Sequence, residues 1–263
     1  MFEIDVKEGT VIPIDKPRQW TSFQVVNKLK WYLKRTLGLK KIKIGHAGTL
    51  DPLASGLLLV CVGSATKQIE SLQAGIKEYS GTIVFGATTP CFDLEQPIDA
   101  YYPYKQITKE AIDTARQSFI GTFPQIPPMF SAVKVNGQRA YISARDGSTA
   151  DIKPKDVTVY DFTVVDFRPG NPNATLPTVV AVPDNQPLKK ELYRNPQGII
   201  PEFLPQMDFH ITCSKGTYIR SIARDLGLAL HSGAFLGALR MERIGNFRLE
   251  QAITIDDLFV QND

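Results

Sequence analysis

The stretch GHAGTLDPLASGLLLVCV, residues 45–62, constrains the fold more than any other part of the chain. Its apolar end, LLLVCV, follows a loop rich in glycine and proline, which is typical of a buried strand. Asp51 precedes this strand, and Pro52 disfavours helical geometry at the residue before it. Asp51 as the cap of an Asp-Pro turn is the simplest interpretation. We also expect it at the edge of the core, facing a cleft, where burial would raise its pKa unless a cation lies nearby.

The other segments predict strands and helices in irregular alternation. We expect strands at residues 9–17, 78–89, 156–167, 207–214 and 239–252, and helices at 21–38, 107–121 and 216–230. Ser22 is a candidate cap for the first helix, and Gly38 is placed to end it. Asn136-Gly137 predicts a hairpin, and residues 140–147 look helical. This order favours a mixed α+β domain with a largely antiparallel sheet.

Charge is unevenly distributed along the chain. Seven Lys and Arg residues and no acidic residue lie between Lys28 and Lys43. A solvated helix face would explain this run, and a polyanionic partner is the alternative. A second candidate site lies in CSKGTYIRSIARDLG, where a predicted strand gives way to a helix. Arg220 in this segment is either a solvated helix residue or the cation that Asp51 needs.

Several classes of protein are disfavoured by composition. No apolar run is long enough for a membrane span, and the N-terminus resembles no signal peptide, so we expect a cytoplasmic protein without a membrane partner. The three cysteines are far apart and lack CxxC spacing, so we expect buried free thiols. The three histidines are equally scattered, so we expect no metal. We also find no P-loop and no dinucleotide fingerprint.

Five blocks of the sequence resemble, in the same order, blocks of the TruB family of tRNA pseudouridine synthases, which modify uridine 55 in the T-arm of tRNA. The blocks are GHAGTLDPLASGLLLVCVGSATK, KEYSGTIVFG, PPMFSAVKVNGQRAY, CSKGTYIRSIARDLG and LRMERIGNF. The resemblance implies the pseudouridine synthase fold, an α+β fold with a mixed, largely antiparallel central sheet flanked by helices and loops.

The resemblance also implies a domain organisation. Residues 1–250 would form the catalytic domain, with a thumb-like segment at about 122–152. Residues 169–206, rich in proline and asparagine, would be an insertion, either a passive surface loop or an aid to tRNA binding. The short tail 251–263 leaves no room for the C-terminal PUA domain that bacterial members commonly carry.

Carried over by position, the resemblance makes Asp51 the catalytic carboxylate and Arg220 its ion partner. Tyr79 would stack on the target base, Tyr218 would line the pocket, and Leu239 would contact the uracil. For each of these three side chains, ordinary packing in the core is the simpler alternative.

Three further residues receive supporting roles from the resemblance. His46 would hold the RNA beside the flipped nucleotide, and a hydrogen-bonded turn residue is the alternative. Asp93 would support the site, although ATTPCFDLE is less acidic than the family's usual segment and Asp93 could cap a loop. Lys67 would contact a phosphate, or it is a solvated lysine.

The activity implied is the isomerisation of uridine to pseudouridine at position 55 of tRNA, with base flipping and an aspartate-dependent break and re-formation of the glycosidic bond. This reaction imports no group and needs no cofactor. We expect a monomer that binds the T-arm of tRNA without an obligate protein partner. The competing interpretations are a tRNA-binding or tRNA-folding protein, a related synthase acting on another RNA, and a hydrolase with a carboxylate nucleophile.

Overall fold

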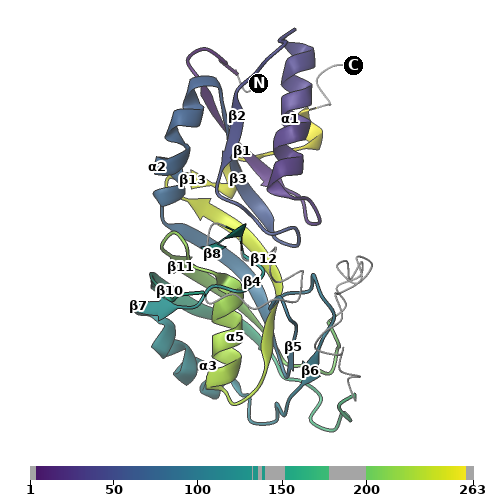
Figure 1. Ribbon diagram of the computed structural model, residues 1–263. Helices are drawn as coiled ribbons and strands as arrows, with labels where there is room; N and C mark the ends of the chain where they lie inside the picture. The colour runs from purple at the N-terminus through teal and green to yellow at the C-terminus, as the bar shows by residue number, and fades with distance from the viewer. Residues whose placement is uncertain (1–3, 132, 136–137, 140–151, 178–199, 259–263) are drawn as a thin grey trace. The chain divides into compact units, whose positions relative to one another are not determined.

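The apolar run forms strand β3 (Ser55–Val62), which is buried from Gly56 to its end, as the sequence predicts. The computed structural model that shows this describes residues 4–131, 133–135, 138–139, 152–177 and 200–258 (Figure 1). The chain folds into two compact units. Unit 1 comprises residues 1–80 and 239–263, and unit 2 comprises residues 81–238.

Unit 1 is built around β3. Strands β1 (Thr10–Lys16) and β2 (Ile44–Ala47) both lie antiparallel to β3, whereas β12 (Ala234–Ile244) pairs with its start in parallel. Strand β14 (Ile253–Thr254) adds to β1 in parallel, and β13 (Phe247–Arg248) folds back on β12. The helical segments of this unit are α1 (Ser22–Thr36), η1 (Gly63–Gln68), α2 (Ile69–Ala74), η4 (Leu249–Gln251) and η5 (Asp256–Leu258).

Unit 2 has an antiparallel sheet with β10 (Lys155–Arg168) between β7 (Gly121–Gln125) and β11 (Gln206–Cys213). Its core is aromatic, and the buried rings of Phe162 and Phe209 meet edge to face. The helical segments are α3 (Lys109–Ala115), η2 (Arg116–Phe119) and α5 (Ile219–Ala229). The short strands are β5 (Ala87–Thr88), β6 (Ala100–Tyr101), β8 (Lys134–Val135) and β9 (Gln138–Arg139).

Two strands belong to both units: β4 (Lys77–Phe85) begins in unit 1 and ends in unit 2, and β12 runs the other way. Most strand pairs are antiparallel, while β1–β14 and β3–β12 are parallel. The predicted α+β class with a mixed, largely antiparallel sheet is therefore confirmed.

The first helix corrects one prediction. Its N-cap is Thr21, whose hydroxyl accepts the backbone N–H of Gln24 while the Gln24 side chain accepts the N–H of Thr21. Ser22 does not cap the helix, because its hydroxyl bonds to a loop distant in sequence. Gly38 adopts φ +64° just after the helix, as the predicted end requires.

Other predictions hold in part. Within the helix predicted at 107–121, only α3 is α-helical. The chain then forms the 3₁₀ turn η2, and Gly121 already belongs to β7. Strands β8 and β9 pair across Asn136-Gly137, which confirms the hairpin. The predicted helix at 140–147 lies outside the described residues, as does most of the insertion at 169–206. The ends of that insertion meet where the Asn171 N–H donates to the Phe203 carbonyl.

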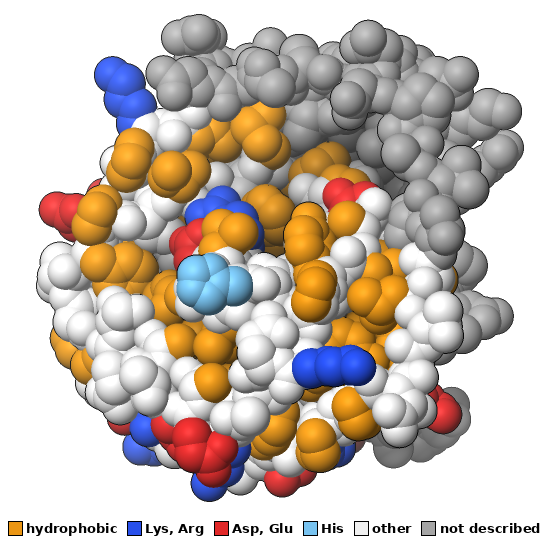
Figure 2. Space-filling view, turned by 90° about the horizontal axis from the view of Figure 1, so that it is seen from below, with side chains coloured by type: hydrophobic (Ala, Val, Ile, Leu, Met, Phe, Trp, Pro, Cys, Tyr) orange, Lys and Arg blue, Asp and Glu red, His pale blue; other side chains and the backbone are white. Residues whose placement is uncertain are grey.

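Charged side chains are scattered on the face shown in Figure 2. Lys and Arg occur there singly or beside Asp and Glu, among hydrophobic and uncharged groups. Within the described part of the chain, no helix is both long and apolar enough to cross a bilayer.

Candidate active site

Asp51 lies in the loop that joins β2 to β3, and it is half-buried. Its carbonyl accepts the N–H of Ala54 at 3.1 Å, which closes a turn over Pro52 and Leu53. The carboxylate thus stands just before the buried strand β3. The structure bears out both the turn and the position at the edge of the core.

The residues on either side of Asp51 are fixed by residues that precede or begin α1. The Ser22 hydroxyl accepts the Leu50 N–H at 3.0 Å and lies 3.3 Å from the Leu50 carbonyl, to which it donates. The Pro52 carbonyl accepts the Gln19 N–H at 2.7 Å. Because these bonds bracket Asp51, the backbone that carries its carboxylate has little freedom.

Lys16 is a second anchor of this loop and has no exposed surface. Its ammonium donates to the carbonyls of Trp20 at 2.6 Å, Pro17 at 3.0 Å and Pro52 at 3.4 Å. A buried ammonium needs such acceptors, because losing its hydration costs several kcal/mol. Sequence pattern carries no sign of this role, since a lysine at the end of a strand is ordinarily exposed.

Three other predicted residues of unit 1 lie on strands: His46, Leu239 and Tyr79. His46 is on β2 opposite Val60 of β3, and its Nδ1–H donates to the Gly48 carbonyl, which leaves Nε2 as an acceptor in the neutral ring. Leu239 is half-buried on β12, next to Arg240, which is in register with Ser55.

Tyr79, the third, is 8% exposed on β4. The residues flanking it bond to β12: Glu78 forms an ion pair with Arg243 at 2.5 Å, and the Ser80 hydroxyl donates to Glu242. The structure thus places His46 on β2, Asp51 in the loop before β3, Leu239 on β12 and Tyr79 on β4. These four strands follow one another in strand pairing.

Lys67 lies elsewhere in unit 1. It is exposed on η1, beyond the end of β3 opposite to Asp51, and the strand between them spans roughly 25 Å. The structure does not place Lys67 beside Asp51. Its predicted phosphate contact remains a prediction.

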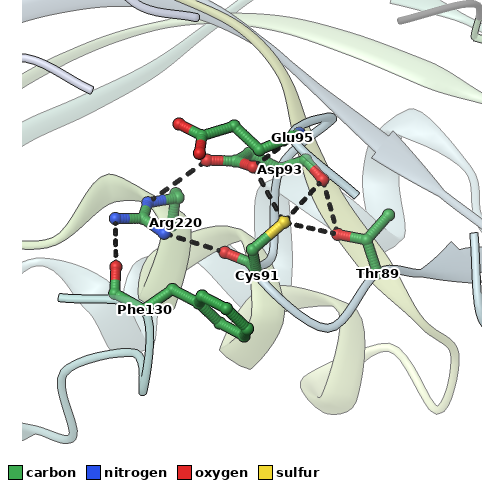
Figure 3. A network of polar contacts seen from close by, with 6 residues as sticks. All are labelled: Thr89, Cys91, Asp93, Glu95, Phe130 and Arg220. Carbon is green, nitrogen blue, oxygen red and sulfur yellow. Dashed lines mark hydrogen bonds and ion pairs between the residues drawn. The ribbon is translucent and has the colours of Figure 1, made fainter. Parts of the chain in front are cut away.

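In unit 2, Arg220 and Asp93 form a buried ion pair, with 3.5 Å between Nε and Oδ2 and 6% of each side chain exposed (Figure 3). The other guanidinium nitrogens donate to two backbone carbonyls, of Cys91 at 3.0 Å and Phe130 at 2.9 Å. The predicted pair between Arg220 and Asp51 joins residues of different units and remains a prediction.

Asp93 has two more donors. The Cys91 thiol donates to Oδ1 at 2.9 Å, and the Glu95 N–H donates to the same oxygen at 2.9 Å. Burial, followed by the Asp93 charge and hydrogen bond, raises the pKa of the Cys91 thiol well above its usual range, so it remains a donor. The sequence predicts a buried thiol at Cys91 but not this contact, which depends on a turn in which the Phe92 N–H donates to the Thr89 carbonyl and Phe92 adopts φ +61°.

Tyr218 precedes α5, and a buried glutamine binds its backbone. The Gln125 side chain donates to the Tyr218 carbonyl at 3.1 Å and accepts the Tyr218 N–H at 2.8 Å. The Ile126 carbonyl accepts from Ser221 and Arg224 of α5. Residues 125–130, the start of the predicted thumb, are thus bonded to the same helix end that carries Tyr218 and Arg220.

The described residues contain no cluster of three or more His, Cys, Asp or Glu suited to a metal ion, and the three cysteines are buried and free. The predicted site residues are instead mainly carboxylates, a guanidinium and aromatic rings. Tyrosine rings can stack on a planar base, and carboxylates and guanidinium groups can pair with opposite charges.

Comparison with known proteins gives the family. Residues 34–181 match the model of the TruB family pseudouridylate synthase N-terminal domain. Two similar curated proteins are the tRNA pseudouridine synthases B of Phocaeicola vulgatus and Flavobacterium johnsoniae. Each is 44% identical; the matches cover 96% and 94% of this chain, and 93% of each relative.

A solved structure of a Cbf5-Nop10-Gar1 complex contains a similar chain. It is 26% identical with a TM-score of 0.60, and the match covers 96% of this chain but only 54% of that one. Family model, relatives and fold agree: the chain belongs to the TruB family of pseudouridylate synthases.

Proposed function

We propose that this enzyme converts uridine 55 in the T-arm of tRNA to pseudouridine, with Asp51 as its catalytic carboxylate. The relatives named tRNA pseudouridine synthase B support tRNA as the substrate. The observation that carries the role of Asp51 is its bracketed position, half-buried before β3 with both neighbouring residues anchored. A carboxylate held in this way is pre-organised toward one reacting atom.

The reaction balances without an added reagent. The N1–C1′ bond breaks, the uracil rotates, a C5–C1′ bond forms, the C5 proton is lost and N1 gains a proton. Asp51 acts either by covalent attack or by assisting elimination to a glycal. Both routes require the carboxylate to be charged, and Arg220 is the cation proposed to keep it so.

A uridine inside a folded T-loop is out of reach, so we propose that the enzyme flips it out of the loop. Tyr79 stacks on the flipped base, Tyr218 and Leu239 line its pocket, and His46 supports the RNA beside it. Asp93 acts indirectly by holding Arg220. We also propose that the enzyme acts in the cytoplasm and as a monomer. Light scattering after gel filtration would test the monomeric state.

Mapping pseudouridine in unmodified tRNA tests this proposal. We expect one modified uridine in the T-loop with the wild type and none with Asp51→Asn, which keeps the shape of the side chain. Asp156→Asn, at an exposed aspartate of β10, is the matched control and should give full product. Product from Asp51→Asn would contradict the mechanism. Tight tRNA binding by the wild type without product would favour the tRNA-binding interpretation.

A further inference from the structure

Helix α1 carries an aromatic ring in the middle of its solvent side. The buried stripe of the helix consists of Val25, Val26, Leu29 and Leu33. At 100° per residue, Trp31 lies directly opposite this stripe. Its side chain is 52% exposed, so packing into the core does not account for a tryptophan here.

Two cations lie over this ring. The Lys28 ammonium and the Arg35 guanidinium are each 5.5 Å from the centre of a Trp31 ring, one turn before and one turn after it. Cation–π attraction narrows the positions that such long side chains sample. Lys34 and Lys30 lie on one side of the ring, about 60° and 100° around the helix axis from Trp31; Lys30 is exposed and Lys34 half-buried. We call Lys28, Lys30, Trp31, Lys34 and Arg35 the α1 face.

The sequence around this face is strongly basic. From Lys16 to Ile69 the chain has ten Lys and Arg residues and one acidic residue, Asp51. Among the described residues, no acidic side chain forms an ion pair with Lys30, Lys34 or Arg35. Arginines elsewhere, such as Arg168, bind carboxylates. A cationic surface of this kind attracts a polyanion.

The α1 face also has a fixed place relative to Asp51, because both belong to unit 1. Helix α1 begins at Ser22, which bonds to the backbone of Leu50. Trp31 follows nine residues later, about 14 Å along the axis. An RNA whose nucleotide reaches Asp51 therefore has further phosphates within reach of this helix.

We propose that the α1 face binds the phosphate backbone of the tRNA substrate outside the reacting nucleotide, and that Trp31 positions Lys28 and Arg35 for these contacts. The choice of tRNA as the ligand rests on the proposed function. Lysine and arginine supply the attraction, and holding two of them on an indole reduces the entropy lost when phosphate binds.

Binding of unmodified tRNA across a series of salt concentrations tests the charges. We expect the triple variant Lys30→Gln/Lys34→Gln/Arg35→Gln to bind roughly tenfold or more weakly at about 0.1 M salt. The slope of log K against log salt should fall by about 2, because each lost phosphate contact removes about 0.7 to 0.9. The matched control Lys7→Gln/Lys105→Gln/Lys109→Gln removes three exposed charges elsewhere and should change affinity by less than about twofold.

The role of Trp31 is tested in variants that keep the four cations of the α1 face. Trp31→Leu should weaken tRNA binding by about three- to fivefold, and Trp31→Phe by less, since phenylalanine retains a weaker cation–π contact. At saturating tRNA, kcat should stay at the wild-type value for both variants. A lower kcat with unchanged binding would assign Trp31 to the catalytic centre and contradict the proposal.

Wild-type affinity and salt slope in the triple variant would overturn the proposal, as would an equal loss in the control. A protein ligand on this face would also appear as unchanged tRNA binding. If the wild type binds tRNA but modifies no uridine, the proposed function fails, while the binding measurements still decide the role of the α1 face.

Discussion

Arg220 illustrates how much a single buried side chain holds together. Its guanidinium contacts Asp93 and the carbonyl of Cys91 in one segment and the carbonyl of Phe130 in another, both far from Arg220 in sequence. Arginine suits this position because its planar fork offers donors in fixed directions. The ion pair with Asp93 offsets part of the cost of burying that charge.

Removal of Asp93 should therefore be costly. We expect Asp93→Ala to lower the free energy of unfolding by about 3 to 5 kcal/mol, because it leaves the buried Arg220 charge without this partner. Urea denaturation followed by circular dichroism measures the change. Asp113→Ala removes the partner of Arg116 in a 39% exposed position and should cost less than about 1 kcal/mol. Equal losses would show that burial adds nothing to the Asp93 pair.

The reactivity of the Cys61 thiol should depend on pH in a way that reports its burial. Burial raises its pKa to about 11, from an ordinary value near 9. Since only the thiolate reacts, alkylation of native protein should be slow at about pH 8 and keep rising toward about pH 11. A variant with Cys91→Ala and Cys213→Ala isolates this thiol. In denaturant, the alkylation rate of the same variant should level off near the ordinary pKa of the thiol. A native rate that levels off at that same pH would contradict the effect of burial on the Cys61 pKa.

At the scale of elements, two neighbouring hydroxyls at the start of α1 have different roles, and only one of them contacts the Asp51 loop. Thr21 caps the helix, whereas Ser22 bonds both backbone groups of Leu50. Ser22→Ala should lower stability by about 1 to 3 kcal/mol, because the Leu50 groups lose their partner. It should also lower kcat, because the backbone beside Asp51 is released.

Thr21→Ala serves as the matched control for that variant. It should lower stability by about 1 kcal/mol through loss of the cap, and leave kcat for pseudouridine formation unchanged. Equal effects of the two substitutions on kcat would mean that the loop bonds do not position Asp51.

The sequence predicts the elements better than their contacts. Strand β3 and helix α1 follow from an apolar run and a helical spacing, which are local properties. The cap was misplaced by one residue because Thr21 and Ser22 are both good caps, and only the distant Leu50 decides between them. Three features depend on residues far along the chain or on the path of a turn. They are the burial of the Lys16 ammonium, the hydrogen bond from the Cys91 thiol to Asp93, and the hydrogen bonds between the Gln125 side chain and the Tyr218 backbone. Local pattern carries no signal for them.

At the scale of the whole molecule, the segment expected to be a short tail takes part in the fold. Strand β14 pairs with β1 through Ile14 opposite Ile253 and Asp15 opposite Thr254. Ile255 follows with 6% exposure. The first and last described strands of the chain thus lie side by side in unit 1.

This pairing predicts that the end of the chain matters for stability. Ile255→Ala should lower the free energy of unfolding by about 2 kcal/mol or more, since it removes buried apolar atoms and leaves a cavity. Val165→Ala, at a 61% exposed position of β10, should change it by less than about 0.5 kcal/mol. Thermal melts of both variants measure the difference. Equal melting temperatures of the two variants would show that the segment around the last strand does not contribute to the stabilising core.

The β1–β14 pairing also sets an order of events during synthesis. More than about 200 residues separate the two strands, so at about 5 to 20 residues per second a ribosome makes the second roughly 10 to 50 s after the first. For that time the outer edge of β1 has no native neighbour, and an open edge invites pairing with other chains. Slowing translation should therefore increase aggregation of the nascent enzyme, whereas a chaperone that covers extended segments should protect it.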